Sequence, residues 1–208
     1  MAQPGTRSAS RATDAAIAND RVGLDGPFDP AWLTLRPFAA RYAAVVAGWV
    51  NDEDDLFRLA PGTRSPLTAA KVVAWTSNGG CGWLLAADGR TRVSGYAELN
   101  SIDHDPGALW LGHLILDPDA RGRGWGHRLV SSLVSQAFGP MAASAIVLVV
   151  FPDNEPAIRC YQRAGFRVRR EESHRFRGRR RHRMLRMELV NPNPQTRPSV
   201  RLDPACGV

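Results

Sequence analysis

The sequence lacks the long apolar runs and the cysteine frameworks that mark membrane and secreted proteins. No run approaches the about 20 apolar residues that a membrane-spanning helix needs, and the longest, residues 142–151, has the pattern of a buried strand. Three scattered cysteines, Cys81, Cys160 and Cys206, favour a reducing compartment over a disulfide framework. Residues 1–30 contain no apolar core of signal-peptide type. We therefore expect a cytoplasmic protein.

Metal-ligand groupings and lysine are also scarce. No set of histidines and cysteines has the spacing of a zinc site, so we expect no bound metal. Lys71 is the only lysine, and the other basic side chains are arginines. Ten of these arginines lie in residues 167–186 against only Glu171 and Glu172, although the net charge of the whole chain is only +7. The basic character therefore belongs to one segment and not to the whole surface.

The remaining composition is that of one soluble globular domain. The chain has 208 residues, of which 44% are hydrophobic and 23% charged, which is enough for a single buried core. Residues 1–30 are small and polar and are predicted to form a disordered arm. Residues 191–208, with four prolines, are predicted to form a flexible tail. The folded domain is therefore expected to cover residues 31–190.

The apolar periodicity places the elements of this domain. Strands are predicted over residues 33–38, 81–87, 92–99, 109–117, 146–151, 166–170 and 184–190. Helices are predicted over residues 39–50, 67–75 and 124–138, and between an N-cap at Asn154 and a terminating Gly165. Thr68 is a candidate cap for the second helix, and Asp88-Gly89 is a hairpin turn signal. The order β-α-α-β-β-β-α-β-α-β-β predicts a single α/β domain with a mixed sheet.

A glycine-rich turn joins the strand 109–117 to the helix 124–138. The run Arg121-Gly-Arg-Gly-Trp-Gly126 lets the backbone approach a ligand closely, in front of the free N–H groups of a helix N-terminus. It therefore predicts an anion site. The run lacks the Lys and Ser or Thr that end a Walker loop. Its G-x-G-x-G spacing, after a meander, also differs from the G-x-G-x-x-G of a dinucleotide-binding unit.

This loop resembles one of two signatures of the GNAT superfamily. Arg121-x-x-Gly124-x-Gly126, preceded by Asp117-Pro118, resembles the acetyl-CoA loop of that superfamily. The run NEPAIRCYQRAGF over residues 154–166 is similar to the second signature, and GYAEL over residues 95–99 resembles the strand before the cofactor strand. The resemblance covers residues 33–190. It implies a GNAT-like fold and an acetyl-CoA-dependent N-acetyltransferase in which the amine attacks directly in a ternary complex.

The resemblance also implies how acetyl-CoA is held. Backbone groups of the strand before the loop bind the pantetheine arm, the loop backbone holds the pyrophosphate, and an asparagine contacts the cofactor from the next helix. The implied cofactor-binding residues are Leu114, Ile115, Leu116, Arg121, Gly122, Arg123, Gly124, Trp125, Gly126 and Asn154.

Acetyl transfer also needs a proton for the departing thiolate. The resemblance implies Tyr161 as this general acid, and a phenol pKa of about 10 keeps the side chain protonated at neutral pH. Packing in the core is the alternative role of Tyr161, since it shares a helical face with Ala157 and Ile158. Cys160 lies about 100° away around the helix, so we do not expect a thiol nucleophile.

The base that takes the amine proton is less defined. Some members of the superfamily carry a glutamate on the strand after the cofactor helix, where this chain has Val149. Glu98 and His113 remain as candidates, the latter because histidine titrates near neutral pH. Glu98 has the alternative of an edge residue facing solvent. Alternation groups His113 with Leu111 and Ile115, so its alternative is a core histidine.

The acceptor and the basic segment leave other functions open. The acidic residues 52–55 either receive a cationic amine or are solvated charges at a helix end. The segment 167–186, with Phe176 among its arginines, suits a nucleic-acid- or ribosome-binding module, or else is a solvated hairpin. A catalytically inactive acyl-CoA-binding protein is a third alternative. We expect a small molecule, a protein N-terminus or a lysine as acceptor, no membrane partner, and a monomer or homodimer.

Overall fold

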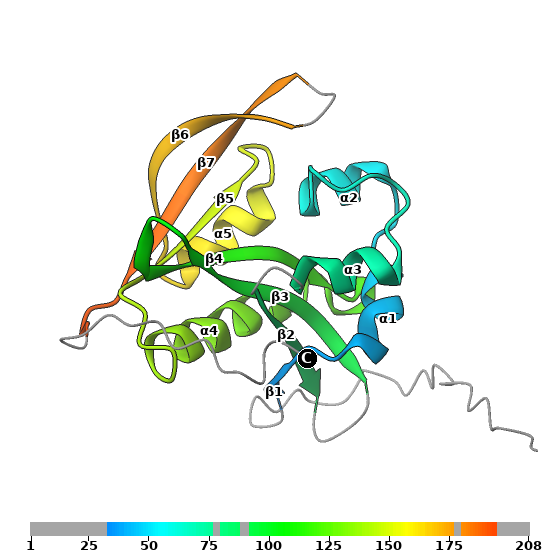
Figure 1. Cartoon of the computed structure of the whole chain (residues 1–208), viewed down its shortest axis with the longest axis horizontal. Coiled ribbons are helices and arrows are strands. Elements are labelled where there is room, and N and C mark those ends of the chain that lie inside the picture. The colour runs from blue at the N-terminus through cyan, green and yellow to red at the C-terminus, as the bar shows by residue number, and fades with distance from the viewer. Residues whose placement is uncertain (1–32, 77–79, 88–91, 177–179, 195–208) are drawn as a thin grey trace, which may run out of the picture. The chain divides into compact units, whose positions relative to one another are not determined.

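The computed structural model describes residues 33–76, 80–87, 92–176 and 180–194, which build one seven-stranded sheet with flanking helices (Figure 1). The strands are β1 Leu33–Pro37, β2 Cys81–Ala87, β3 Val93–Ile102, β4 Asp105–Leu116, β5 Ala145–Val150, β6 Arg167–Arg175 and β7 Arg181–Val190. The helices are α1 Ala43–Ala47, α2 Glu53–Leu59, α3 Ala69–Thr76, α4 Trp125–Phe138 and α5 Glu155–Arg163, with 3-10 turns η2 Ala40–Tyr42 and η3 Pro118–Ala120. Among the helices described, none is long and apolar enough to cross a membrane.

The sheet is mixed, as the sequence predicts. Its strand order is β1-β2-β3-β4-β5-β7-β6. β1 to β4 form an antiparallel meander, β4 and β5 pair in parallel across α4, and β7 pairs antiparallel with both β5 and β6. The predicted order of elements is confirmed with one addition, the helix α2. The carboxylate of Asp52 accepts the N–H of Asp55 at 2.8 Å, so the acidic residues 52–55 cap and begin this helix, which agrees with the alternative of charges at a helix end.

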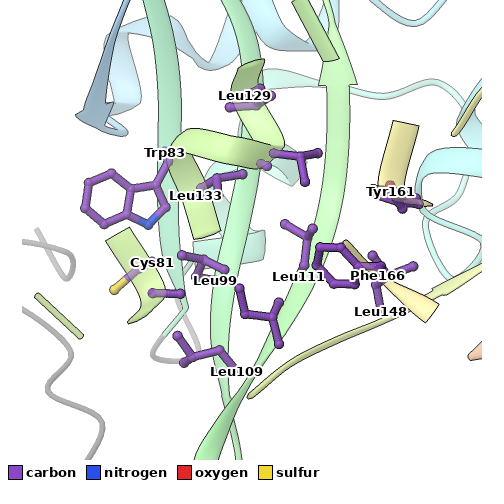
Figure 2. Close-up of a cluster of buried hydrophobic side chains, with 14 of the residues drawn as sticks. Cys81, Trp83, Leu99, Leu109, Leu111, Leu129, Leu133, Leu148, Tyr161 and Phe166 are labelled. Atoms are coloured by element: carbon purple, nitrogen blue, oxygen red, sulfur yellow. The ribbon is translucent and has the colours of Figure 1, made fainter. Parts of the chain in front are cut away.

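Two apolar clusters lie on opposite faces of this sheet. α4 and α5 cover the first cluster, and Figure 2 shows side chains from the helices and the strands meeting there, among them Leu99, Leu111, Leu129, Leu133 and Phe166. α1 and α3 cover the second cluster, which includes Val46, Val72, Tyr96 and Ile115. Because side chains alternate along a strand, Glu98 on β3 shares the α1–α3 face with Tyr96.

The last hairpin is longer than the sequence predicts. The strand predicted over residues 166–170 extends as β6 to Arg175, and the strand predicted over 184–190 begins as β7 at Arg181. Backbone ladder bonds hold these extensions, and β6 lies at the sheet edge, where charged side chains remain in solvent. An apolar pattern cannot detect such a strand. Residues 177–179 at its tip lie outside the described residues.

Three other predictions fall wholly or partly outside the residues that the structure describes. The predicted arm at residues 1–30 and the Asp88-Gly89 turn both lie outside the described residues. Of the predicted tail, residues 191–194 are described. Asn191 is buried there, and its side-chain amide donates to the carbonyl of Ala143 at 2.9 Å. This first tail residue is therefore part of the packed domain.

Candidate active site

The two parallel strands at the centre of the sheet separate toward their C-terminal ends. Pairing between β4 and β5 covers only the residues from Ala108 to Trp110 and from Ala145 to Val147. β4 nevertheless continues to Leu116 and β5 to Val150. Beyond Trp110, the β4 backbone therefore has its β3 partner on one edge and no β5 partner on the other. Backbone N–H and C=O groups on that edge are available to an extended ligand.

The glycine loop follows directly from this edge. Gly122 and Gly124 have φ values of 73° and 81°, in the left-handed region that favours glycine. A Cβ added at either position would meet nothing within 4 Å, so the backbone conformation requires these glycines and packing does not. Gly124 caps α4 without a side-chain hydrogen bond. Gly124 thus leads into the first turn of α4, whose leading N–H groups have no acceptor within the helix, as a helix N-terminal anion site requires.

The side chain of Arg121 points away from an anion in this loop. Its guanidinium donates to the carbonyl of Trp49 at 2.7 Å, to Asp55 Oδ2 at 3.2 Å and to the carbonyl of Leu116 at 3.3 Å. Arg121 thereby ties the loop to the segment between α1 and α2. Arg123, by contrast, is exposed, and Trp125 is buried as the first residue of α4.

Asn154 and Tyr161 both come from α5, the helix after β5. Asn154 Oδ1 accepts the N–H of Ala157 at 3.3 Å, which confirms it as the N-cap, and its Nδ2 has no hydrogen-bond partner among the described residues. The Tyr161 ring is buried next to Phe166, with 5.9 Å between ring centroids. Figure 2 shows Phe166 beside Leu148 and Tyr161 at the edge of the first cluster. Burial raises the pKa of Tyr161, which keeps its hydroxyl protonated.

Glu98 is a buried carboxylate with three partners on the α1–α3 face. The hydroxyl of Tyr96 donates to its Oε1 at 2.5 Å, and the amide of Asn100 donates to its Oε2 at 3.1 Å. His113 Nδ1 lies 3.0 Å from Oε1. Burial alone would raise the pKa of Glu98, but His113, Tyr96 and Asn100 outweigh it, and the pKa lies below its usual value. Glu98 is therefore ionised at neutral pH and is no solvent-facing edge residue.

A β-bulge brings His113 to Glu98. The register of β3 on β4 shifts between Tyr96 and Glu98, and His113 has a φ of 41°. The alternation that groups His113 with Leu111 and Ile115 is wrong, because the bulge puts Leu111 in the α4–α5 cluster and Ile115 in the other.

The ring of His113 stacks on Trp75 of α3, with 4.1 Å between ring centroids and 15° between planes. His113 is 28% exposed and Glu98 only 1%, so the imidazole is the more accessible member of the pair.

Sequence reasoning missed several members of this network. Tyr96 and Asn100 flank Glu98 at a spacing of two, so strand alternation contained a signal for them. Trp75 belongs to a helix on top of the sheet, and no local pattern indicates its contact with His113.

Comparison with known proteins relates this geometry to proteins of named activity. A model described as the acetyltransferase (GNAT) family matches residues 46–166. The chain is 36% identical over 86 residues to mycothiol acetyltransferase from Actinosynnema mirum, across 41% of this chain and 28% of that protein. It is 32% identical over 69 residues to spermine/spermidine N(1)-acetyltransferase from Bacillus subtilis, across 33% of this chain and 45% of that protein. The matched part thus spans less than half the length of either relative.

A solved structure supports the fold over a larger share of the chain. The spermidine N-acetyltransferase from Vibrio cholerae, in complex with CoA and spermine, superposes with a TM-score of 0.64 at 17% identity. The superposition covers 77% of this chain and 96% of that one. At this identity the likeness concerns the fold alone.

Proposed function

Because the chain belongs to the acetyltransferase (GNAT) family, we propose that it transfers an acetyl group from acetyl-CoA to a primary amine by direct attack in a ternary complex. The observation that carries this proposal is the separation of β4 from β5 next to the open glycine loop. An extended pantetheine arm needs free strand-edge groups, and a pyrophosphate needs free N–H groups at a helix N-terminus. The β4 edge without a β5 partner and the glycine loop lie on one continuous segment of the chain, residues 111–126.

This arrangement supports a set of residues that would hold the donor. Backbone groups of Leu114, Ile115 and Leu116 would pair with the amide groups of the pantetheine arm. Backbone N–H groups of residues 122–126 would bind the pyrophosphate, together with the exposed side chain of Arg123. The free Nδ2 of Asn154 would contact the donor from α5. Arg121 would contribute by holding the loop in place, since its guanidinium is already bonded within the protein.

In the reaction the amine nitrogen forms a bond to the thioester carbonyl carbon and the carbon–sulfur bond breaks. His113 is the accessible base that would accept the amine proton, directly or through water, and Glu98 would stabilise the resulting imidazolium. On the other side, the Tyr161 hydroxyl would give its proton to the departing thiolate. A β4 backbone N–H would face the charge that grows on the carbonyl oxygen. Solvent would later exchange the two protons and restore both side chains.

The test is a pair of substitutions at Gly124. Gly124→Asp adds a negative charge where the pyrophosphate belongs and should abolish acetyl-CoA binding in calorimetry while the protein stays folded. Gly124→Ala is the matched control, because it meets the same left-handed backbone, which costs about 1–2 kcal/mol, without adding charge. It should bind acetyl-CoA more weakly than the wild type but measurably. Unchanged affinity in Gly124→Asp would remove this proposal.

A further inference from the structure

One face of the sheet joins the proposed base to the β6–β7 hairpin. Asn100, which hydrogen-bonds Glu98, is the cross-strand partner of Trp110 on β4, and Trp110 is paired with Val147 on β5. Two residues further, Val149 is paired with Arg186 on β7. Paired residues on neighbouring strands project to the same face, so Arg186 lies on the face that carries Glu98.

Aromatic rings on this face of the β6–β7 hairpin contact α2. Along β7, His182 and Arg186 share a face by alternation. The ring of His182 lies 4.9 Å from that of Phe57 on α2, and the ring of Phe176, just after β6, lies 5.9 Å from Phe57. Phe57 also contacts Phe151 at the end of β5, at 5.2 Å. α2 therefore packs both against the β6–β7 hairpin and against the residue that follows β5.

Positive charge exceeds negative charge at Arg186. Its nearest carboxylate is Glu172, 3.6 Å away, and that carboxylate is already bound by Arg170 and His174, each at 2.8 Å. Arg170 is the direct cross-strand partner of Arg186. One carboxylate therefore serves two guanidinium groups and an imidazole. The side chain of Arg186 is only 28% exposed, so solvent screens its charge incompletely.

The acidic side chains nearby are already paired. Asp55 of α2 holds Arg121 at 3.2 Å, and Asp153 after β5 holds Arg58 of α2 through two hydrogen bonds of 3.0 and 2.9 Å. A polyamine acceptor would bring further positive charge toward Arg170 and Arg186. An acceptor with a negative group would instead complete the pairing of Arg186, because a guanidinium binds carboxylates and phosphates in a forked geometry.

We propose that the acceptor carries an anionic group, a carboxylate or a phosphate, in addition to its amine, and that Arg186 binds this group. The inference rests on the proposed acetyl transfer. Arg186 lies on β7, one strand beyond Val149, and neighbouring strands lie about 5 Å apart, so the site that it would offer to an anion lies beside the C-terminal end of β5. Arg186 then determines acceptor specificity, and the amine is that of an amino acid, a peptide or a phosphorylated amine.

The experiment uses pairs of amines that differ by one anionic group. Thiol release from acetyl-CoA is measured with tyrosine against tyramine, and with O-phosphoethanolamine against ethanolamine, and spermidine serves as the polycationic comparison. We expect kcat/KM to favour the anionic member of at least one pair, and that pair identifies the group as carboxylate or phosphate. Arg186→Gln should reduce this preference by about 10- to 100-fold, the usual worth of a hydrogen bond to a charged group.

Arg183→Gln is the matched control. Arg183 lies on the same strand and projects from the opposite face, where it pairs with Glu171 at 2.6 Å. Its replacement should leave the preference unchanged, and Arg186→Lys, which keeps the charge, should retain part of it. A wild-type preference for the amine that lacks the anionic group, or for spermidine, would overturn the proposal. An equal preference in Arg186→Gln and wild type would overturn it as well.

A binding measurement separates this inference from the proposed function. In the presence of CoA, calorimetry compares N-acetyltyrosine with N-acetyltyramine, and the phosphorylated pair in the same way, in wild type and Arg186→Gln. If the anionic compound binds more tightly and this depends on Arg186, the anion site is supported, even where no amine is turned over. The absence of turnover would then contradict the acetyl transfer alone. Binding that is indifferent to Arg186 in both pairs would overturn the anion site while leaving the acetyl transfer standing.

Discussion

Tyr161 lies at the border between the core and the proposed reaction centre. Its ring packs in the α4–α5 cluster beside Phe166, and its hydroxyl has no hydrogen-bond partner among the described residues. A buried tyrosine usually has such a partner. A ring held by packing with an unpaired hydroxyl suits a proton donor whose partner arrives with the substrate.

Tyr161→Phe keeps the ring and removes the proton. We expect turnover to fall by about 10²- to 10⁴-fold, because a positioned general acid contributes about that much. The affinity for acetyl-CoA should stay within about twofold of the wild type. Steady-state kinetics and calorimetry measure the two quantities. Equal turnover in both proteins would return Tyr161 to a role in packing alone.

Glu98 and His113 are paired in the structure, so we expect replacement of either side chain to affect the rate. His113→Asn keeps a polar side chain of similar size that cannot accept a proton, and it should lower kcat/KM near neutral pH, where the acceptor amine is mostly protonated. Glu98→Gln keeps the imidazole but removes the carboxylate that faces it at 3.0 Å, and it should also lower kcat/KM near neutral pH. Rates of both variants should approach the wild-type rate as pH rises toward the pKa of the acceptor amine.

The measurement is a pH profile of kcat/KM for the wild type and the two variants. A replacement that only weakens acceptor binding would raise KM by a similar factor across the whole pH range. Three identical profiles would place the base elsewhere, or would mean that the amine binds in its neutral form.

At the scale of elements, α2 connects the glycine loop with the β6–β7 hairpin. Asp55 in its first turn pairs with Arg121 of the loop, Arg58 pairs with Asp153 after β5, and Phe57 meets the hairpin. Seven residues are too few to form a stable isolated helix in water. The position of α2 therefore depends on these contacts.

Asp55→Asn tests this connection. It removes the charge of the Arg121 pair, and we expect the free energy of unfolding to fall by no more than about 1 kcal/mol, because both side chains are about one-third exposed. In a double-mutant cycle with Arg121→Gln, the two losses should not add. Glu53→Gln, in the same helical turn and without an ion pair among the described residues, is the control. Urea unfolding gives all the values, and strictly additive losses would show that α2 and the loop are independent.

At the scale of the whole molecule, the arginine-rich segment 167–186 carries less unpaired positive charge than its composition suggests. Glu171, Glu172 and Glu188 each pair with arginines of the hairpin. This pairing reduces the charge available to a nucleic acid, although Arg167, Arg175 and Arg181 have no carboxylate partner among the described residues. A nucleic-acid-binding module thus remains a weaker explanation of this segment than an anionic acceptor.

The ion pairs of the whole molecule also predict its response to acid. Four described carboxyl groups, Asp55, Glu98, Asp153 and Glu172, have pKa values below the ordinary 3.8 of aspartate or 4.5 of glutamate. Burial opposes ionisation at Asp55, Glu98 and Glu172, but their basic and hydrogen-bonding partners outweigh it. Arg58 lowers the pKa of Asp153 directly. Each group therefore contributes stability that is present above its unfolded pKa and is lost as pH falls through its folded pKa.

We expect the midpoint of urea unfolding to fall as pH decreases below about 4.5, the upper of the two ordinary values. Glu98→Gln should flatten this part of the curve most, because Glu98 is the most buried of the four. Differential scanning calorimetry provides a second readout. A midpoint that stays constant between pH 6 and pH 3.5 would contradict the assigned partners.

The amino-acid sequence by itself determined the parts of the molecule whose structure is local. Gly122 and Gly124 reveal a left-handed turn because few other residues adopt that conformation readily, and Asn154 and Gly165 mark the ends of α5 for similar reasons. The mixed sheet followed from the alternation of strand and helix patterns. The glycine loop and the helix that follows it could therefore be predicted before any contact was known.

Only the tertiary structure decided which side chains meet at the proposed active site. Arg121 bonds to Trp49 and Asp55, 72 and 66 residues away, and the bulge at His113 brings that side chain to Glu98 and Trp75. Arg186 reaches the same face of the sheet through the register of β5 with β7. Such contacts join residues distant in the chain, and no propensity or spacing encodes them. They follow from how the strands pair, which depends on the packing of the whole domain.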